Sequence, residues 1–391
     1  MDGKVGDTNI IKLAVPKLRL GMFITAIDKA GKLNISKPGQ IKSHDDIKKL
    51  ATSGINHVWV DAARSTDNCG LIKSTSLRAI KPKKPTREQG QEKAKRLMAE
   101  AKGLVQKVLS ETFEGKAIEV APFEDLADNM IESVMLDADA FKCISALRSK
   151  DAYLLEHSIN VAFLLVTFGK YLNLQREELK QLAVGGILHD IGKIKVDNKV
   201  LHKPGKLTPE EFEHMKLHQV YAQQILAETS GLSKISRDVC LMHHEKLDGK
   251  GYPNGLEGDE LTLYGRMSCI VDIFDALTAT RCYKEAMSPA AAFKILLSLT
   301  PFHLDQKLVY EFIRCVGIYP VGSLVQLSDG RIGIVWDAKG RDALHPILKC
   351  FYSVKHKRYT EVTMIDLLKS DLNIERGISP SSLEVDPTPF Y

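Results

Sequence analysis

Histidine and carboxylate side chains recur in the middle of this 391-residue chain at spacings that suit a metal centre. Imidazole nitrogens and carboxylate oxygens are natural ligands for divalent cations, provided that helices bring them to one place. The set is larger than one ion needs, so the sequence predicts a pair of divalent metal ions. The predicted metal residues are His157, His189, Asp190, His218, His243, His244 and Asp272.

The adjacent pair His243 and His244 is the most specific part of this pattern. A single pair such as His189-Asp190 is weaker, because a buried histidine often hydrogen-bonds to a carboxylate for structural reasons. Neighbouring residues of a helix point about 100° apart, so two adjacent rings can reach two ions, or one ion and its surroundings. A glycine-rich turn follows at residues 248–253, and its glycines permit close approach by a ligand. The combined pattern indicates a metal centre with a ligand-binding turn beside it.

These motifs resemble the HD-GYP family of bacterial cyclic dinucleotide phosphodiesterases. The chain has HD-x-GK from His189, a later single histidine, HHExxDGxGYP from His243, and a downstream aspartate ahead of R-x-Y-K. The resemblance runs from about residue 151 to about residue 300. It implies a helical metallohydrolase that opens cyclic di-GMP to linear pGpG in second-messenger signalling. It also implies two divalent ions, with iron or manganese favoured over other transition metals.

Two alternatives remain beside that function. Some members of the family act on 3',3'-cyclic GMP-AMP instead, and the sequence does not distinguish the two substrates. A catalytically inactive receptor for the dinucleotide would be expected to have lost metal ligands, whereas this chain has kept the whole set. A nucleotide phosphohydrolase of the wider HD superfamily would lack the GYP loop, which is intact at residues 251–253. The phosphodiesterase is therefore the favoured interpretation.

The resemblance also implies roles for single residues. In the family the histidine that corresponds to His157 is the first residue of the metal site along the chain, and the family pattern selects Asp272 as a ligand. We expect Asp275 to support the ligands. Because a carboxylate has two oxygens, we expect Asp190 to bridge both ions. We expect Lys193 to hold or protonate a phosphate oxygen, so Asp190 and Lys193 are the predicted catalytic residues. The predicted substrate contacts are Lys193, Gly249, Gly251, Tyr252, Pro253, Arg266, Arg281 and Lys284.

A variant of the family binds a third metal with a glutamate one helical turn before the first histidine. Tyr153 takes that place here, and Glu156 points in another direction on the helix, so we predict two metals rather than three. We assign His202 to neither ion. Where many members have His-Pro, this chain has His218-Gln219, a difference that we expect not to affect the ring.

Four parts are expected along the chain, and the fold class is mainly α. Residues 1–80 form a small α/β accessory domain that resembles an uncharacterised domain often found ahead of HD-GYP domains. Residues 81–148 hold a linker and connecting helices, and residues 149–318 form the HD-GYP catalytic domain, a helical bundle. Residues 319–391 form a small β appendage, since short strand-like runs alternate there with glycine turns. The proline-rich end, residues 379–391, is expected to be loose.

Composition is that of an ordinary globular protein, with 44% hydrophobic and 26% charged residues. The net charge of +5 is too small to indicate a nucleic acid polymer or a membrane surface as partner. The seven cysteines form no CxxC pair, which favours reduced thiols. No apolar stretch resembles a signal peptide or a bilayer span. We therefore expect a cytoplasmic protein without membrane insertion that binds a cyclic dinucleotide; a homodimer and a protein partner of the N-terminal domain stay open.

Overall fold

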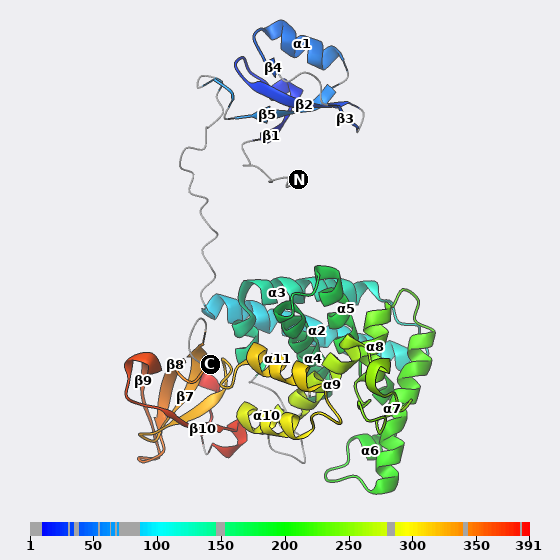
Figure 1. Cartoon of the computed structure of the whole chain (residues 1–391), viewed down its shortest axis with the longest axis vertical. Coiled ribbons are helices and arrows are strands. Elements are labelled where there is room, and N and C mark those ends of the chain that lie inside the picture. Colours follow the sequence, from blue (N-terminus) through cyan, green and yellow to red (C-terminus); the bar gives the residue numbers. More distant parts are fainter. Residues whose placement is uncertain are drawn as a thin grey trace. The chain divides into compact units, whose positions relative to one another are not determined.

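The structure is a computed structural model that divides into two compact units, Met1–Lys84 and Pro85–Tyr391 (Figure 1). The residues that it describes are 10–29, 32–34, 39–53, 55–62, 64–66, 69, 87–145, 153–279, 286–338, 343–383 and 385–391.

An antiparallel sheet and one helix make up the N-terminal unit. The sheet has the order β1-β5-β2-β3, and β4 pairs with β2. Helix α1 (His44–Thr52) begins after Ser43, whose hydroxyl accepts a hydrogen bond from the Asp46 backbone, while the Asp46 carboxylate accepts one from the Ser43 backbone. The small α/β unit predicted for this part of the chain is confirmed. Its remaining elements are β1 (Ile10–Ala14), η1 (Val15–Lys17), β2 (Phe23–Lys29), β3 (Lys32–Asn34), β4 (Gly39–Gln40) and β5 (Ile55–Asp61).

The second unit is a helical bundle that continues into a small sheet (Figure 1). Helix α4 is central, because it packs against α2, α3, α5, α9 and α11 and is buried along most of its length. The mainly helical core that the sequence predicts is confirmed. None of the helices in the described part of the chain has the length and apolar character of a membrane span. The helices and 3-10 turns are α2 (Arg87–Phe113), α3 (Ala121–Ser145), α4 (Tyr153–Tyr171), α5 (Arg176–Leu188), η3 (Ile191–Lys195), α6 (Asn198–Leu201), α7 (Pro209–Ala227), α8 (Lys234–Met242), η4 (Gly258–Glu260), α9 (Leu263–Thr278), α10 (Pro289–Ser298) and α11 (Gln306–Val316).

Four aromatic rings tie the last helices of the bundle to α4. The rings of Phe168 on α4 and Phe312 on α11 lie 5.2 Å apart at their centroids. Phe274 on α9 lies 5.2 Å from Phe312 and 5.1 Å from Phe293 on α10. Edge-to-face and stacked aromatic contacts of this kind add to the stability that burial gives. The cluster therefore fixes α9, which carries one of the predicted metal residues.

The C-terminal sheet is antiparallel, with the order β10-β6-β7-β8-β9, and β10 contacts α10. The final residues do not form the loose end expected from their prolines. The Phe390 ring stacks on Phe351 of β8, with centroids 4.4 Å apart, and the Tyr391 hydroxyl donates to the Gly322 carbonyl. The stabilisation gained by packing these rings exceeds the tendency of the prolines to leave the segment without regular structure. The expectation of a loose end is therefore wrong. The elements are β6 (Leu324–Leu327), β7 (Arg331–Asp337), β8 (Ile347–Ser353), β9 (Arg358–Asp366), η5 (Leu367–Lys369), β10 (Ile374–Ile378), η6 (Pro380–Ser382) and η7 (Thr388–Phe390).

Removing the central ring of the aromatic cluster should weaken the bundle. Phe312 is fully buried, so Phe312→Ala should lower the free energy of unfolding by about 3–5 kcal/mol through lost burial and the cavity left behind. Urea unfolding of the metal-free protein measures this. Phe113→Ala on α2, where the ring is 76% exposed, serves as the control and should change stability by no more than about 0.5 kcal/mol. Equal effects of the two substitutions would contradict the assigned packing.

Candidate metal centre

Five helices converge on one buried cluster of histidine and aspartate side chains. Helix α4 supplies one histidine, the end of α5 a histidine and an aspartate, α7 a histidine, the end of α8 two histidines and α9 an aspartate. The ligand atoms form three overlapping groups, within each of which they lie no more than 4.8 Å from one another. The structure therefore brings all the predicted metal residues together. The groups are His157, His189 and Asp272; His189, Asp190 and His243; and His218, His243 and His244.

Two glycines allow the helices to approach this closely. A Cβ atom at Gly186 of α5 would lie 2.6 Å from the Cα of Ala162 on α4, and one at Gly192 would lie 1.9 Å from the carbonyl oxygen of His218 on α7. Any larger residue would push these segments apart, since atoms cannot pack at such distances. The glycine of the HD-x-GK motif therefore holds Asp190 close to α7.

Three of the histidine rings are oriented in the same way. The Nδ1 atoms of His189, His218 and His243 each lie 2.6–2.8 Å from the backbone carbonyl oxygen three residues earlier. A carbonyl only accepts hydrogen bonds, so Nδ1 carries the proton and the Nε2 lone pair is free for another partner. Histidines that bind metals are commonly fixed by such a bond at the other ring nitrogen.

His157 is oriented by carboxylates instead. Its Nδ1 lies 2.7 Å from Oδ2 of Asp275, and its Nε2 lies 3.0 Å from Oδ1 of Asp272. Burial lowers the pKa of His157, but the hydrogen bonds to Asp272 and Asp275 outweigh it and raise this pKa to about 9. Burial also lowers the pKa of His218 and His243, which favours their neutral forms. His157 is thus a strongly basic ring, whereas the rings of His218 and His243 are neutral.

Asp190 lies between two pairs of rings, with its Oδ2 toward His157 and His189 and its Oδ1 toward His218 and His243. Its Oδ2 lies 3.3 Å from Nε2 of His189 and accepts a hydrogen bond from Lys193. Its Oδ1 lies 3.7 Å from Nε2 of His218 and 3.9 Å from Nε2 of His243. Burial alone would raise the pKa of Asp190, but the charge of the Lys193 ammonium outweighs it and holds this pKa well below its ordinary value. The carboxylate therefore offers a negative charge to both sides.

Two buried atoms on the α7 side of Asp190 have no hydrogen-bond partner among the described residues. They are Oδ1 of Asp190 and Nε2 of His218, and their separation of 3.7 Å is too long for a hydrogen bond. Buried polar atoms seldom remain unpaired, because desolvation without a partner is costly. A cation between these lone pairs would satisfy both, so the residues present fit a divalent metal.

The glycine-rich turn packs against the second histidine of the adjacent pair. The Tyr252 ring stacks on His244, with centroids 4.7 Å apart and an angle of 29° between the planes. The Glu245 carboxylate accepts hydrogen bonds from the backbone of Asn254 and Leu256. Residue spacing alone did not identify this organising role of Glu245. The carboxylate fixes the turn, and with it the position of Tyr252.

A pocket of about 430 Å³ opens at this turn. The residues that line it include the adjacent histidines, the aromatic residues Phe212 and Tyr252, and the lysines Lys216, Lys246 and Lys250. The Lys216 Nζ lies 5.7 Å from the centroid of each of the two rings. Phe212 and Lys216 were not predicted from the sequence. The only sequence feature that could have indicated them is their spacing of one turn on α7, the helix that carries His218. Rings and cations together suit a nucleotide.

The predicted substrate contacts do not all meet at this pocket. Gly251 and Tyr252 line it, whereas Gly249 and Pro253 do not. The Arg266 guanidinium donates to the carbonyls of two loop residues and to the carboxylates of Asp259 and Asp305, so its described contacts are structural.

The remaining predicted contacts, Arg281 and Lys284, lie outside the described residues. His202, which we assigned to neither ion, is exposed and belongs to none of the three groups. Glu156, which we do not expect to be a ligand, forms an ion pair instead: its Oε1 lies 2.5 Å from the Lys102 Nζ on α2.

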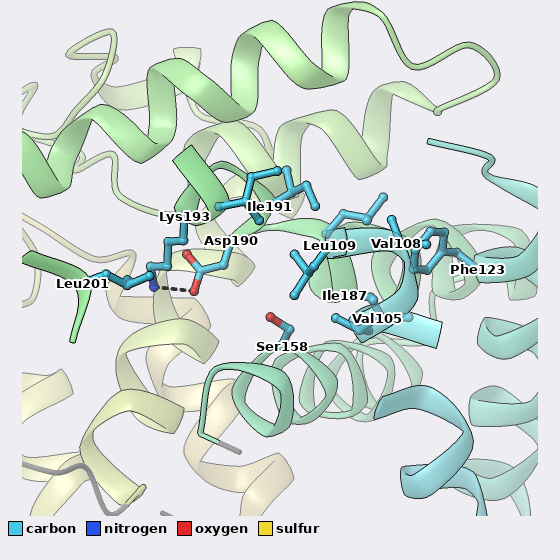
Figure 2. Close-up of a pocket in the computed structure, with 12 residues that line it drawn as sticks. Val105, Val108, Leu109, Phe123, Ser158, Ile187, Asp190, Ile191, Lys193 and Leu201 are labelled. Atoms are coloured by element: carbon cyan, nitrogen blue, oxygen red, sulfur yellow. Dashed lines mark hydrogen bonds and ion pairs between the residues drawn. The ribbon is translucent and has the colours of Figure 1, made fainter. Parts of the chain in front are cut away.

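Lys193 lies at a second, smaller pocket of about 100 Å³ (Figure 2). Its bond to Asp190 closes one end of the space, and apolar side chains of α2 and α3 form the other, among them Val105, Val108 and Phe123. Helix α2 therefore contacts the surroundings of the centre twice, here and at Glu156.

The chain is similar to known proteins in its domains, its sequence and its fold. The chain matches a family model described as an HD domain over residues 142–308 and one described as a domain of unknown function (DUF3391) over residues 10–123. A cyclic di-GMP phosphodiesterase of Pseudomonas aeruginosa is 32% identical over 374 residues, which are 91% of this chain and 88% of that relative. A 3'3'-cGAMP-specific phosphodiesterase of Vibrio cholerae is 35% identical over 154 residues, 39% of this chain and 30% of that relative. An HDG"Y"P protein from Bdellovibrio bacteriovorus, at 14% identity, has a similar fold, with a TM-score of 0.50 over 78% of this chain and 98% of that one.

Removing the charge that orients His157 should weaken metal binding. Asp275→Asn keeps the size of the side chain but no longer offers a carboxylate to Nδ1, so metal affinity should fall about 10- to 100-fold at one position. Equilibrium dialysis with Mn²⁺ and elemental analysis measure the bound ions. Asp259→Asn, at a fully exposed carboxylate, should bind as the unmodified protein does. Unchanged binding in Asp275→Asn would contradict the orienting role.

Proposed function

Because the chain belongs to the HD-GYP family of cyclic dinucleotide phosphodiesterases, we propose that it hydrolyses cyclic di-GMP to linear pGpG. A relative that matches nearly the full length of both chains is named a cyclic di-GMP phosphodiesterase. The observation that carries the proposal is the position of Asp190, whose two oxygens face two different groups of histidines. A buried carboxylate in that position suits a centre that handles two cations and an anionic phosphodiester.

Two divalent ions, iron or manganese, are proposed as the cofactors. The first position would be held by His157, His189 and Asp272, and the second by His218, His243 and His244, with Asp190 shared between them. The free lone pairs at Asp190 and His218 support the second position. Two such ions supply Lewis acidity and lower the pKa of water when bound. A third ion is not proposed, because Glu156 is ion-paired with Lys102.

Charge on the substrate phosphate is proposed to be balanced by Lys193. Its ammonium contacts the Asp190 carboxylate and is 22% exposed, so it can donate to a phosphoryl oxygen brought to the centre. Burial raises the pKa of the Tyr252 hydroxyl, which therefore remains protonated and can donate as well. These two residues would orient the phosphodiester and stabilise the charge that develops on it.

One nucleotide half of the substrate is proposed to occupy the pocket at the glycine-rich turn. Its volume of about 430 Å³ lies in the range of small-molecule sites. The Phe212 ring is 48% exposed and can stack on a purine, while Lys216 stands beside it. This arrangement accepts guanine and adenine alike.

Cyclic GMP-AMP remains the second candidate substrate. Relatives from Vibrio cholerae named 3'3'-cGAMP-specific phosphodiesterases match this chain at 35–40% identity, over 30–36% of their own lengths. An inactive receptor is disfavoured, because the complete set of predicted ligands lies together in the structure.

A turnover assay tests the proposed function. Protein loaded with Mn²⁺ or Fe²⁺ is expected to convert cyclic di-GMP to pGpG, as measured by chromatography of the products. A parallel assay with 3',3'-cyclic GMP-AMP measures which of the two substrates it opens faster. Asp190→Asn should lower the rate at least about 100-fold, which corresponds to a few kcal/mol of lost stabilisation. Asp259→Asn is the matched control and should be fully active. Absence of product from both substrates, with two ions bound, would favour the receptor instead.

The stacking role of Phe212 gives a separate prediction. Loss of the ring in Phe212→Ala should raise KM about 5- to 100-fold, the range expected for one lost base stack, and leave kcat nearly unchanged, since the ring lies away from the reacting atoms. Steady-state kinetics with cyclic di-GMP measures both constants. Phe113→Ala should leave both at their original values. A fall in kcat without a change in KM would show that the ring does not hold a base.

A further inference from the structure

Gln219 is a fully buried polar residue in the wall of the metal centre. It follows His218 on α7 and has an exposed fraction of 0%. Its Nε2 lies 3.3 Å from Nε2 of His243, and its Oε1 has no hydrogen-bond partner among the described residues. The sequence-based expectation concerned only the neighbouring His218 ring and did not foresee this contact. The amide group therefore contacts one of the atoms proposed to hold the second ion, Nε2 of His243.

Which atom of the Gln219 amide faces His243 depends on whether the His243 Nε2 is a free lone pair or is bound to a cation. The Nδ1 of His243 donates to the Cys240 carbonyl, so Nε2 is a lone pair that accepts from the Gln219 amide nitrogen. A cation bound at that lone pair removes the acceptor. The oxygen and nitrogen of an amide exchange places by rotation about the last bond. Rotation would bring the unpaired oxygen to the cation and turn the amide nitrogen away from it.

The separation of the two groups agrees with a shared ion. Two ligand atoms that are each about 2.1 Å from one ion, at right angles, lie about 3.0 Å apart. The measured distance between the Gln219 amide and His243 Nε2 is 3.3 Å. Three buried atoms of residues around this position have no hydrogen-bond partner among the described residues, namely Asp190 Oδ1, His218 Nε2 and Gln219 Oε1. With the Gln219 amide rotated, one cation would satisfy all three.

We propose that Gln219 is an additional ligand of the metal centre, which gives its side-chain amide oxygen to the ion held by His218, His243 and His244. The inference rests on the proposed metal centre and goes beyond its predicted ligand set. An amide oxygen is a hard, neutral donor, so it favours an ion such as Mn²⁺ that accepts many oxygen ligands over Zn²⁺, which is satisfied with four ligands. Gln219 is therefore a determinant of metal selectivity at the second position.

Metal binding tests this without any substrate. Gln219→Leu keeps an apolar side chain of similar size but removes the oxygen, whereas Gln219→Glu retains an oxygen donor. Equilibrium dialysis with Mn²⁺ and with Zn²⁺, together with electron paramagnetic resonance of bound Mn²⁺, gives the number and affinity of the ions. Gln223→Leu is the matched control, because this glutamine lies one turn further along α7 and is exposed. Circular dichroism and the thermal midpoint of each metal-free variant check folding.

The unmodified protein and Gln223→Leu should each bind two Mn²⁺ ions. Gln219→Leu should lose Mn²⁺ affinity at one position about tenfold or more, with a smaller loss for Zn²⁺, and Gln219→Glu should recover it. Unchanged Mn²⁺ affinity of Gln219→Leu at both positions would overturn the inference and leave the proposed function standing. If Gln219→Leu does not fold, Gln219→Glu decides the test. A folded Gln219→Glu that binds only one ion would then overturn the inference. Fewer than two ions in the unmodified protein would overturn the proposed metal centre as well.

Discussion

The burial of the Asp190 carboxylate is the constraint on which the rest of the centre depends. A carboxylate removed from water is costly unless positive charge or hydrogen bonds compensate for it. One oxygen of Asp190 accepts a hydrogen bond from the Lys193 ammonium, while the other faces the Nε2 lone pairs of His218 and His243, which cannot donate to it. The close helix contacts at the two glycines and the carbonyl bonds that orient the rings all serve to keep those lone pairs in place. Such an arrangement is stable when cations lie between them.

The two sides of Asp190 differ in charge. On one side His157 lies between two carboxylates, and their hydrogen bonds raise its pKa to about 9 in spite of burial. On the other side the donors are the rings of His218 and His243, whose pKa values burial lowers, together with the neutral amide of Gln219. An ion on the first side meets more negative charge than one on the second. The second position therefore depends more on the number and geometry of its neutral donors.

The sequence predicted which histidines and aspartates lie together, because metal binding restricts the residue types and because the motif fixes their spacing. It did not predict which other residues contact this cluster or the glycine-rich turn. The Gln219 amide reaches a histidine of another helix, and Phe212 faces a turn some forty residues later, at residues 251–252. Arg266 has the character of a phosphate ligand, yet the surrounding loop takes up its hydrogen bonds. The end of the chain is ordered by the stacking of Phe390, which local composition does not encode.

The most direct test of a centre built around Asp190 is anomalous X-ray diffraction from crystals of the protein loaded with Mn²⁺. The account predicts two anomalous peaks about 3.5–4 Å apart, the separation usual in two-metal sites. One peak should lie beside His157 and Asp272 and the other beside His218 and His243, with the Asp190 carboxylate between them. A single peak, or two peaks of which neither lies within bonding distance of Asp190, would contradict it.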